Sequence, residues 1–120
     1  MTFREFLRDR IVVFDGAMGT AVHARDLSLD DFWSKEGCPE VLVLSRPDVV
    51  REIHASFFEA GSQVVETNTF GATGVVLAEF QMADRVREIN LAAARLAREV
   101  AAQFPGPRFV KAADWAIGIT

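Results

Sequence analysis

Short apolar runs alternate with longer segments of helically spaced apolar residues along the chain. Residues 11–14 form a continuous apolar run, which predicts a strand buried on both faces, as in a parallel sheet covered by helices. Residues 63–69, apolar at first and polar at the carboxyl end, predict a second strand, and residues 109–110 begin a third. The expected order is therefore βαβαβ, and right-handed crossovers make all three strands parallel.

The two connecting helical regions carry start and stop signals. Pro47 and Asp48 suit the first turn of a helix, and Gly61 suits the position just after its last turn. A second helical region is predicted over residues 74–103, with an interruption after which Asp84 caps the longer piece. Helices between successive strands complete the α/β pattern.

The remaining segments are shorter or less regular. Residues 3–10 predict a short amphipathic helix. Residues 21–46 predict a surface excursion with one or two helical turns, longer than an ordinary connection between a strand and a helix. Phenylalanines at helical spacings are expected in the core, namely Phe3, Phe6, Phe57, Phe58 and Phe80.

Three strands are few for an α/β fold. An open flavodoxin-like sheet has about five strands and a (β/α)8 barrel needs about 250 residues, whereas this chain has 120. Helices on one side would leave one face and one edge of the sheet uncovered. We therefore expect residues 1–120 to be part of something larger, or to associate with another copy.

Charge and composition exclude several classes of protein. The chain has 13 basic and 17 acidic residues, so it lacks the basic surplus of a nucleic-acid-binding protein. A single cysteine excludes an internal disulfide and a thiolate metal cluster. The first ten residues do not resemble a secretory signal, and no apolar run is long enough to span a membrane. The expectation is a cytoplasmic protein that binds neither nucleic acid nor membrane.

One polar cluster follows the first predicted strand. Asp15 can accept hydrogen bonds from an ammonium group, and the turn at Gly16, Ala17 and Met18 can turn bare backbone N–H groups toward a carboxylate. These groups suit a zwitterion such as an amino acid. The alternative is that Asp15 only caps the following segment and the glycines only form a turn.

A second polar cluster ends the second predicted strand. Glu66 and Asn68 share one face because side chains alternate along a strand, so both can address one ligand. Since the carboxyl ends of parallel strands meet at one edge of a sheet, this cluster is expected beside Asp15. The alternative is ordinary solvation of a strand end, with Asn68 or Thr69 bonding the next loop.

Other residues offer little chemistry. His54 falls within a predicted helix, and His23 and His54 are expected at the surface or in packing. Cys38 precedes a proline and is interpreted as an ordinary thiol. No phosphate-binding loop, dinucleotide fingerprint or zinc-protease motif is present. We predict no catalytic and no metal-ligating residue.

Several motifs, in order, resemble those of a known family. They are VFDGAMGT at 13–20, LVLSRPDVVREIH at 42–54, FEAG at 58–61, ETNTFGA at 66–72, RVREIN at 85–90 and AARLA at 93–97. The chain resembles the N-terminal part of the homocysteine S-methyltransferase family, which includes the homocysteine-binding module of cobalamin-dependent methionine synthase. It departs from the family at Gln81, where a turn glycine is common, and after Val110, where a proline is missing.

The resemblance implies a (β/α)8 TIM barrel, of which this chain supplies about the first three β/α units. It implies methyl transfer to a zinc-bound homocysteine thiolate, giving methionine. Asp15, Gly16, Ala17 and Met18 would hold the amino-acid end of homocysteine, with Glu66 and Asn68 beside them. The family's zinc ligands are cysteines on later strands that this sequence lacks, and cobalamin would be contacted by other domains.

The resemblance implies that this chain is the homocysteine-binding segment of a methyltransferase, and that the segment is inactive by itself. The methyl donor stays open among cobalamin, folate, betaine and S-methylmethionine. The expected partners are homocysteine and either the remainder of the barrel or a second copy. Two alternatives also stay open, a non-catalytic amino-acid-binding module and a truncated remnant without function.

Overall fold

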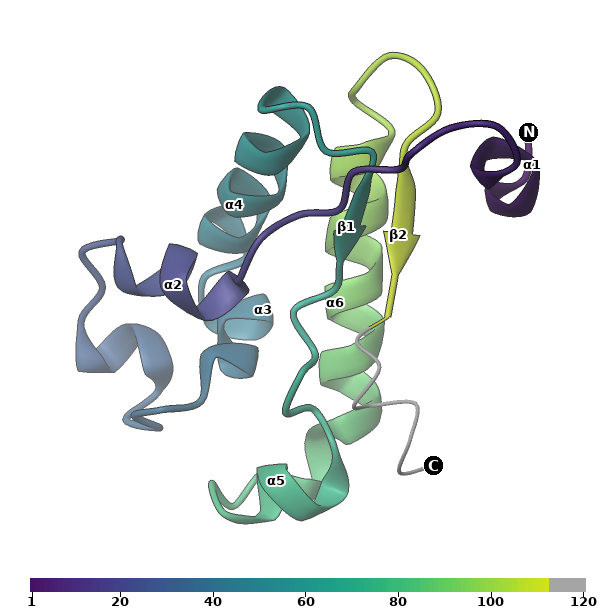
Figure 1. Cartoon of the computed structure of the whole chain (residues 1–120). Helices are drawn as coiled ribbons and strands as arrows, with labels where there is room; N and C mark the ends of the chain where they lie inside the picture. Colours follow the sequence, from purple (N-terminus) through teal and green to yellow (C-terminus); the bar gives the residue numbers. More distant parts are fainter. Residues whose placement is uncertain (113–120) are drawn as a thin grey trace.

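The computed structural model describes residues 1–112 (Figure 1). Helices α4 and α6 form a layer behind strands β1 and β2, and α2 and α3 lie beside α4. The α-helices are α1 (Phe3–Leu7), α2 (Met18–His23), α3 (Leu42–Ser45), α4 (Pro47–Glu59), α5 (Gly74–Ala78) and α6 (Val86–Ala101). The 3₁₀ turns and strands are η1 (Leu29–Phe32), η2 (Pro39–Val41), η3 (Ala83–Arg85), β1 (Val64–Glu66) and β2 (Phe109–Lys111).

The two strands confirm the predicted parallel pairing. β1 and β2 run parallel, with Val64 opposite Phe109 and Glu66 opposite Lys111. The crossover between them is made by α5, η3 and α6, so this part of the chain is a βαβ unit, with a connection long enough to join parallel strands. The predicted second strand is shorter than residues 63–69, because its polar end leaves the sheet and lines the site described below.

The apolar run at residues 11–14 is not a strand. It lies beside β1 through one parallel bridge between Phe14 and Val64, with Gln63 N donating to Val13 O at 2.8 Å. Ile11 is 91% exposed. The prediction of a strand buried on both faces is therefore wrong: Val13 and Phe14 are also exposed. Among the described residues, this run has β1 along one edge and no strand along the other edge.

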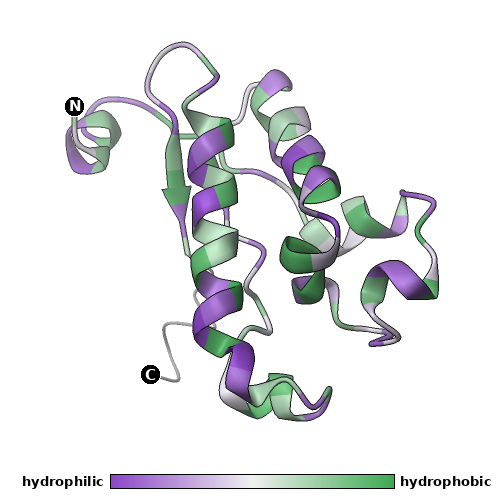
Figure 2. Ribbon diagram, turned by 180° about the vertical axis from the view of Figure 1, so that it is seen from behind, coloured by the Kyte–Doolittle hydropathy of each residue, from purple (hydrophilic) through white to green (hydrophobic). Residues whose placement is uncertain are grey.

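Helices α4 and α6 pack against each other and on one face of the sheet. Hydrophobic and hydrophilic residues alternate along both helices (Figure 2), as expected of amphipathic helices. α4 begins at Pro47, and Gly61 after its end has a φ of +113°, which confirms the predicted start and stop signals. No helix within residues 1–112 has the length and apolarity needed to cross a bilayer.

Helix α1 covers part of the opposite face of the sheet. Val65 packs toward α4 and α6, so its neighbours along β1 and their partners in β2 face the other way. On that face the Phe109 ring lies 5.1 Å from the Phe3 ring and 5.3 Å from the Phe6 ring, measured between centroids. The predicted core phenylalanines Phe6 and Phe58 are buried, whereas Phe3, Phe57 and Phe80 are half-buried.

The segment 21–46 is not a simple surface excursion. Cys38, Val41 and Leu42 are fully buried and belong to the main hydrophobic cluster. Burial can be predicted from the sequence when apolar residues recur at regular spacing, and this irregular segment has no such spacing. The helical content exceeds the predicted one or two turns, because the segment contains η1, η2 and α3 as well as the end of α2.

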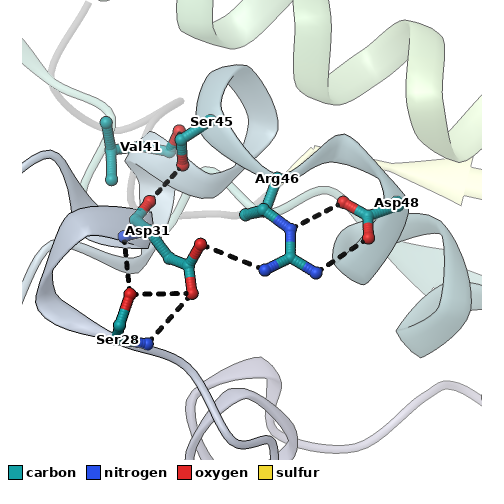
Figure 3. A network of polar contacts seen from close by, with 6 residues as sticks. All are labelled: Ser28, Asp31, Val41, Ser45, Arg46 and Asp48. Carbon is teal, nitrogen blue, oxygen red and sulfur yellow. Dashed lines mark hydrogen bonds and ion pairs between the residues drawn. The ribbon is translucent and has the colours of Figure 1, made fainter.

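A polar network attaches this segment to the start of α4 (Figure 3). The Arg46 guanidinium donates to both carboxylate oxygens of Asp48, at 3.0 and 2.9 Å, and to Asp31 at 3.0 Å. Asp31 in turn forms a capping box with Ser28 at the start of η1, and the Ser45 hydroxyl donates to the Asp31 carbonyl. The Ser28 N–H and the Arg46 guanidinium hold the pKa of Asp31 below its usual value.

The second helical region is interrupted near the predicted place, but Asp84 does not cap the longer helix. Asp84 lies inside η3, which leads directly into α6, and Arg85 occupies the N-cap position without a side-chain cap. Gln81 has a φ of +57°, a left-handed conformation that glycine adopts more easily. This backbone conformation accounts for the glycine expected there from the family resemblance. The predicted departure after Val110 falls mostly in residues outside the described range.

His54 is a buried polar residue on α4. Its side chain is fully buried, and neither ring nitrogen has a hydrogen-bond partner within residues 1–112. Burial therefore lowers the pKa of His54 from 6.5 to about 4. The predicted packing role holds, but the imidazole is packed there as a neutral group with unpaired nitrogens.

Replacement of His54 is expected to stabilise the protein and flatten its acid response. His54→Leu should raise the free energy of unfolding by about 1 kcal/mol at pH 7, because it removes unpaired buried nitrogens. Since the folded pKa lies below the unfolded value, the unfolded chain binds the proton first, so His54 lowers the free energy of unfolding as pH falls from 6.5 toward 4 and has no such effect above pH 6.5. The loss amounts to about 3 kcal/mol for a shift of this size, and the leucine variant should not show it.

Urea unfolding at pH 7 and at pH 4.5 measures both effects. His54→Gln is the matched control, because glutamine keeps a polar buried side chain but cannot titrate. It should remove the acid-dependent loss without the gain at pH 7. An acid response in His54→Leu equal to that of the unsubstituted chain would contradict the prediction.

Candidate functional site

Asp15 lies at the end of the extended segment beside β1. Its backbone N–H donates to Val64 O at 3.0 Å, and its carboxylate Oδ2 accepts from the Glu66 N–H at 3.1 Å. These two bonds hold Asp15 across the carboxyl end of β1. Asp15 therefore does not cap the following helix, which was the alternative interpretation of this residue.

The turn after Asp15 leads directly into α2. Ala17 is the N-cap residue, with extended backbone, and within the described part of the chain it provides no side-chain cap for α2. The first N–H groups of a helix have no partner within the helix. Gly16, Ala17 and Met18 thus connect Asp15 to the first turn of α2.

Glu66 and Asn68 follow on the other side of the site. Glu66 ends β1, and its carboxylate Oε1 lies 3.7 Å from Lys111 Nζ on β2. Asn68 is 3% exposed, and its Nδ2 donates to the Pro39 carbonyl at 2.9 Å. The Asn68 amide group thus bonds a segment earlier in the chain, not the next loop as in the alternative interpretation, and the residue also lines the cavity described next.

All six predicted site residues line one cavity of about 320 Å³. This volume is near the lower end of the range for small-molecule sites. The structure therefore brings together the two polar clusters, which are about fifty residues apart in sequence, as the parallel arrangement of strands predicts. The cavity is lined by Asp15, Gly16, Ala17, Met18, Gly19, Pro39, Glu40, Glu66, Thr67, Asn68 and Phe70.

A larger cavity of about 440 Å³ lies alongside, between α2 and η1. It shares Gly19 and Pro39 with the first cavity, and its lining is mainly apolar, with His23, Ser28 and Glu36 as polar exceptions. It includes neither Asp15 nor Glu66. The smaller cavity is therefore the candidate site.

The electrostatics of the site centre on Asp15. The pKa of Asp15 is raised from 3.8 to about 6: burial is the main cause, the hydrogen bond from the Glu66 N–H opposes it, and the nearby Glu66 charge adds to it. Asp15 is thus ionised at neutral pH but becomes protonated in mildly acidic solution. A carboxylate held in this way favours a positively charged group such as an ammonium.

Glu40 is a site residue that the sequence did not reveal. It lies in η2, is 5% exposed and lines the cavity together with Asp15 and Glu66. Burial is the main cause that raises the pKa of its carboxyl. The one available signal was a glutamate directly before the apolar run that starts at Val41.

The described residues do not fit a zinc ion. They contain no group of three His, Cys, Asp or Glu side chains arranged to hold a metal. Cys38 is fully buried, its thiol donates to Glu40 with a sulfur–oxygen distance of 3.8 Å, and burial raises its pKa to about 11. A zinc ligand is a deprotonated thiolate, so Cys38 is held in the opposite state.

Comparison with known proteins gives a consistent picture. The homocysteine S-methyltransferase family model matches residues 12–116. The chain is 47% identical over 103 residues to a methionine synthase of Mycobacterium tuberculosis and 45% identical over 103 residues to one of Mycobacterium leprae. These alignments cover 86% of this chain in both cases, but 9% and 8% of the two relatives.

Solved structures agree with the sequence comparison. The oxidised form of the homocysteine methyltransferase MmuM from Escherichia coli superposes with a TM-score of 0.70 at 28% identity, over 89% of this chain and 38% of that chain. The metallated form gives a TM-score of 0.71 at 26% identity, over 91% and 39%. The chain thus spans less than half of each of these proteins.

The match runs through both polar clusters and through the helices that support them. It extends over most of the described chain, and the α/β arrangement of the described residues agrees with the solved homocysteine methyltransferases. On these grounds the chain belongs to the homocysteine S-methyltransferase family.

Proposed function

We propose that the described residues form the amino-acid-binding side of a homocysteine site, in a protein that transfers a methyl group to homocysteine to give methionine. The observation that carries this proposal is the single cavity lined by both polar clusters. Membership of the family supports the choice of ligand. The share of a (β/α)8 barrel contributed by this chain, about three β/α units, is part of the same proposal.

The ammonium group of the ligand binds Asp15. Oδ2 of Asp15 already accepts from the Glu66 N–H, so Oδ1 is the oxygen available to a ligand. Ionised Asp15 and Glu66 make this side of the cavity negative, although Lys111 offsets part of the Glu66 charge. A charge-assisted hydrogen bond in such a half-buried site is worth about 1.5–3 kcal/mol.

The carboxylate of the ligand binds the backbone at the start of α2. Ala17 and Met18 line the cavity with Asp15, and both stand at the start of α2, where backbone N–H groups have no partner within the helix. Donors to the carboxylate and an acceptor for the ammonium then lie side by side, which matches the two ends of one α-amino acid. The thiol-bearing side chain points away from both groups.

We assign binding, and not activation of the thiol, to residues 1–112. Zinc would activate the homocysteine thiol in the family, but the buried, protonated Cys38 and the lack of a three-ligand group among the described residues do not suit that ion. No step of methyl transfer is derived from these residues. The identity of the methyl donor and any use of cobalamin belong to other parts of such an enzyme.

Isothermal titration of the 120-residue chain with L-homocysteine tests the proposal. We expect saturable binding with one site per chain, and weaker binding by at least about tenfold for two analogues, each lacking one charged end. These are 4-mercaptobutanoate, which lacks the ammonium, and 3-mercaptopropylamine, which lacks the carboxylate. If neither homocysteine nor methionine gives saturable binding, the proposal is wrong.

A further inference from the structure

Glu40 joins two segments that meet at the candidate site. Its Oε2 accepts from the backbone N–H of Gly71 at 3.2 Å, and its Oε1 accepts from the Cys38 thiol at a sulfur–oxygen distance of 3.8 Å. Both carboxylate oxygens are therefore engaged, one by each segment. A buried carboxylate with both oxygens hydrogen-bonded is a fixed structural element and not a free surface charge.

A second bond links the same segments. Asn68 Nδ2 donates to the Pro39 carbonyl at 2.9 Å. Together with the Gly71 bond it joins η2 to the loop 67–71, and we call these two bonds the η2 clip. The η2 clip fixes the loop that follows β1, and this loop contributes Thr67, Asn68 and Phe70 to the cavity.

Gly71 fits this arrangement closely. A Cβ at position 71 would lie 3.2 Å from Glu40 Oε1 and 3.1 Å from Val76 Cγ1. The absence of a side chain lets the backbone N–H approach the Glu40 carboxylate. The loop 67–71 is thus seated against Glu40 by shape as well as by a hydrogen bond.

The thiol of Cys38 supports the carboxylate from the other side. A thiol donates a hydrogen bond only while it is protonated, and burial raises the pKa of Cys38 to about 11. Cys38 therefore stays a donor throughout the physiological pH range. The single cysteine thus has a structural role as a hydrogen-bond donor to Glu40, which involves neither metal binding nor redox chemistry.

We propose that Glu40 is a positioning residue of the amino-acid site: its carboxylate holds the loop 67–71 through Gly71 and thereby sets Thr67, Asn68 and Phe70 along the cavity beside Asp15. This inference rests on the proposed function for its effect on the ligand. The position of the loop itself does not depend on which ligand binds. Glu40 acts through the loop and does not bind the ammonium group.

Two substitutions separate positioning from charge. Glu40→Asp keeps the negative charge but shortens the side chain by one methylene, so the carboxylate cannot span Cys38 and Gly71. Glu40→Gln keeps the length and loses the charge. Its one amide oxygen can still accept from the Gly71 N–H, and its NH2 group then faces the Cys38 sulfur, which is a weak acceptor. Positioning predicts that homocysteine affinity falls by about tenfold in Glu40→Asp and by less than about threefold in Glu40→Gln.

Titration calorimetry of both variants with homocysteine gives this order directly. Glu36→Asp is the matched control, since Glu36 is exposed, belongs to the same segment and lies outside the candidate cavity. Urea unfolding of each variant checks that it is folded. The reverse order, with Glu40→Gln the weaker binder, or unchanged affinity in both variants, would overturn the positioning role.

A second measurement needs no ligand. In a ¹⁵N-labelled chain, Glu40→Asp should speed hydrogen exchange at the Gly71 amide and shift the Thr67 and Asn68 resonances, while Glu36→Asp should change none of them. Unchanged exchange and shifts in Glu40→Asp would overturn the inference. If the unsubstituted chain binds no homocysteine, the proposed function fails, and the amide measurement still decides whether Glu40 positions the loop.

Discussion

Replacing Asp15 by asparagine is expected to weaken homocysteine binding by about 10- to 100-fold, the effect of losing a charge-assisted hydrogen bond to an ammonium group. Asparagine has the same shape, and its Oδ1 can still accept from the Glu66 N–H that Asp15 now binds. The variant should therefore fold normally. Titration calorimetry at pH 7.5 measures the loss of affinity.

The pH dependence of binding provides an independent check on the same residue. Because the pKa of Asp15 is raised to about 6, the carboxylate is ionised above that pH and protonated below it. Affinity of the unsubstituted chain should therefore fall as pH decreases from 7 to 5, whereas Asp15→Asn should show no such fall. Asp26→Asn, at an exposed aspartate, is the control. Equal affinities of Asp15→Asn and the control would exclude the proposed ammonium contact.

Replacing Phe58 by alanine is expected to lower the free energy of unfolding by about 3–5 kcal/mol. The Phe58 side chain is 1% exposed and lies where α4, β1 and α6 meet, in a cluster with Val65, Ala97 and Val100. Its ring centroid is 5.3 Å from that of Phe104. A domain of this kind has about 5–15 kcal/mol of stability in total, so the variant should be close to unfolding.

Urea unfolding followed by circular dichroism measures this change. Phe70→Ala is the matched control, because the same substitution is made at a side chain that is 69% exposed, and it should cost less than about 1 kcal/mol. Amides of β1 should also lose protection from hydrogen exchange in Phe58→Ala, since the strand rests on this cluster. A loss for Phe58→Ala no larger than that for Phe70→Ala would contradict the packing described for α4.

Elements with strong local signals were predictable from the sequence. α4 begins at Pro47 and stops before Gly61, as the proline and glycine preferences of helix ends require. The parallel orientation of β1 and β2 follows from the helical crossover between them, because adjacent parallel strands need such a connection. Local chemistry and general topology were sufficient for these features.

Elements that depend on tertiary neighbours were not predictable. The apolar run at residues 11–14 resembles a buried strand, but pairing depends on a second neighbour that the described residues do not provide. Asp84 has the chemistry of a cap, yet it lies inside η3, and the N-cap position of α6 falls on Arg85. Burial of Cys38 and Val41 follows from how the irregular segment folds back on α4 and not from any periodicity.

The candidate site shows the same division. Asp15 and Glu66 follow apolar runs, so the sequence predicted that they would meet, and the bond between Asp15 Oδ2 and Glu66 N is direct evidence that they do. Glu40 belongs to a segment without regular structure, and its place in the cavity depends on long-range contacts with Gly71. A carboxylate in a short 3₁₀ turn gives no sequence signal of that contact.

The tight fit at Gly71 has an evolutionary consequence. Any side chain there would press on the Glu40 carboxylate and on Val76. A bulkier residue at position 71 therefore has to displace these two side chains, and a smaller residue at position 40 or 76 favours its acceptance. Across diverging descendants of this protein, these three positions are expected to change together and not one at a time.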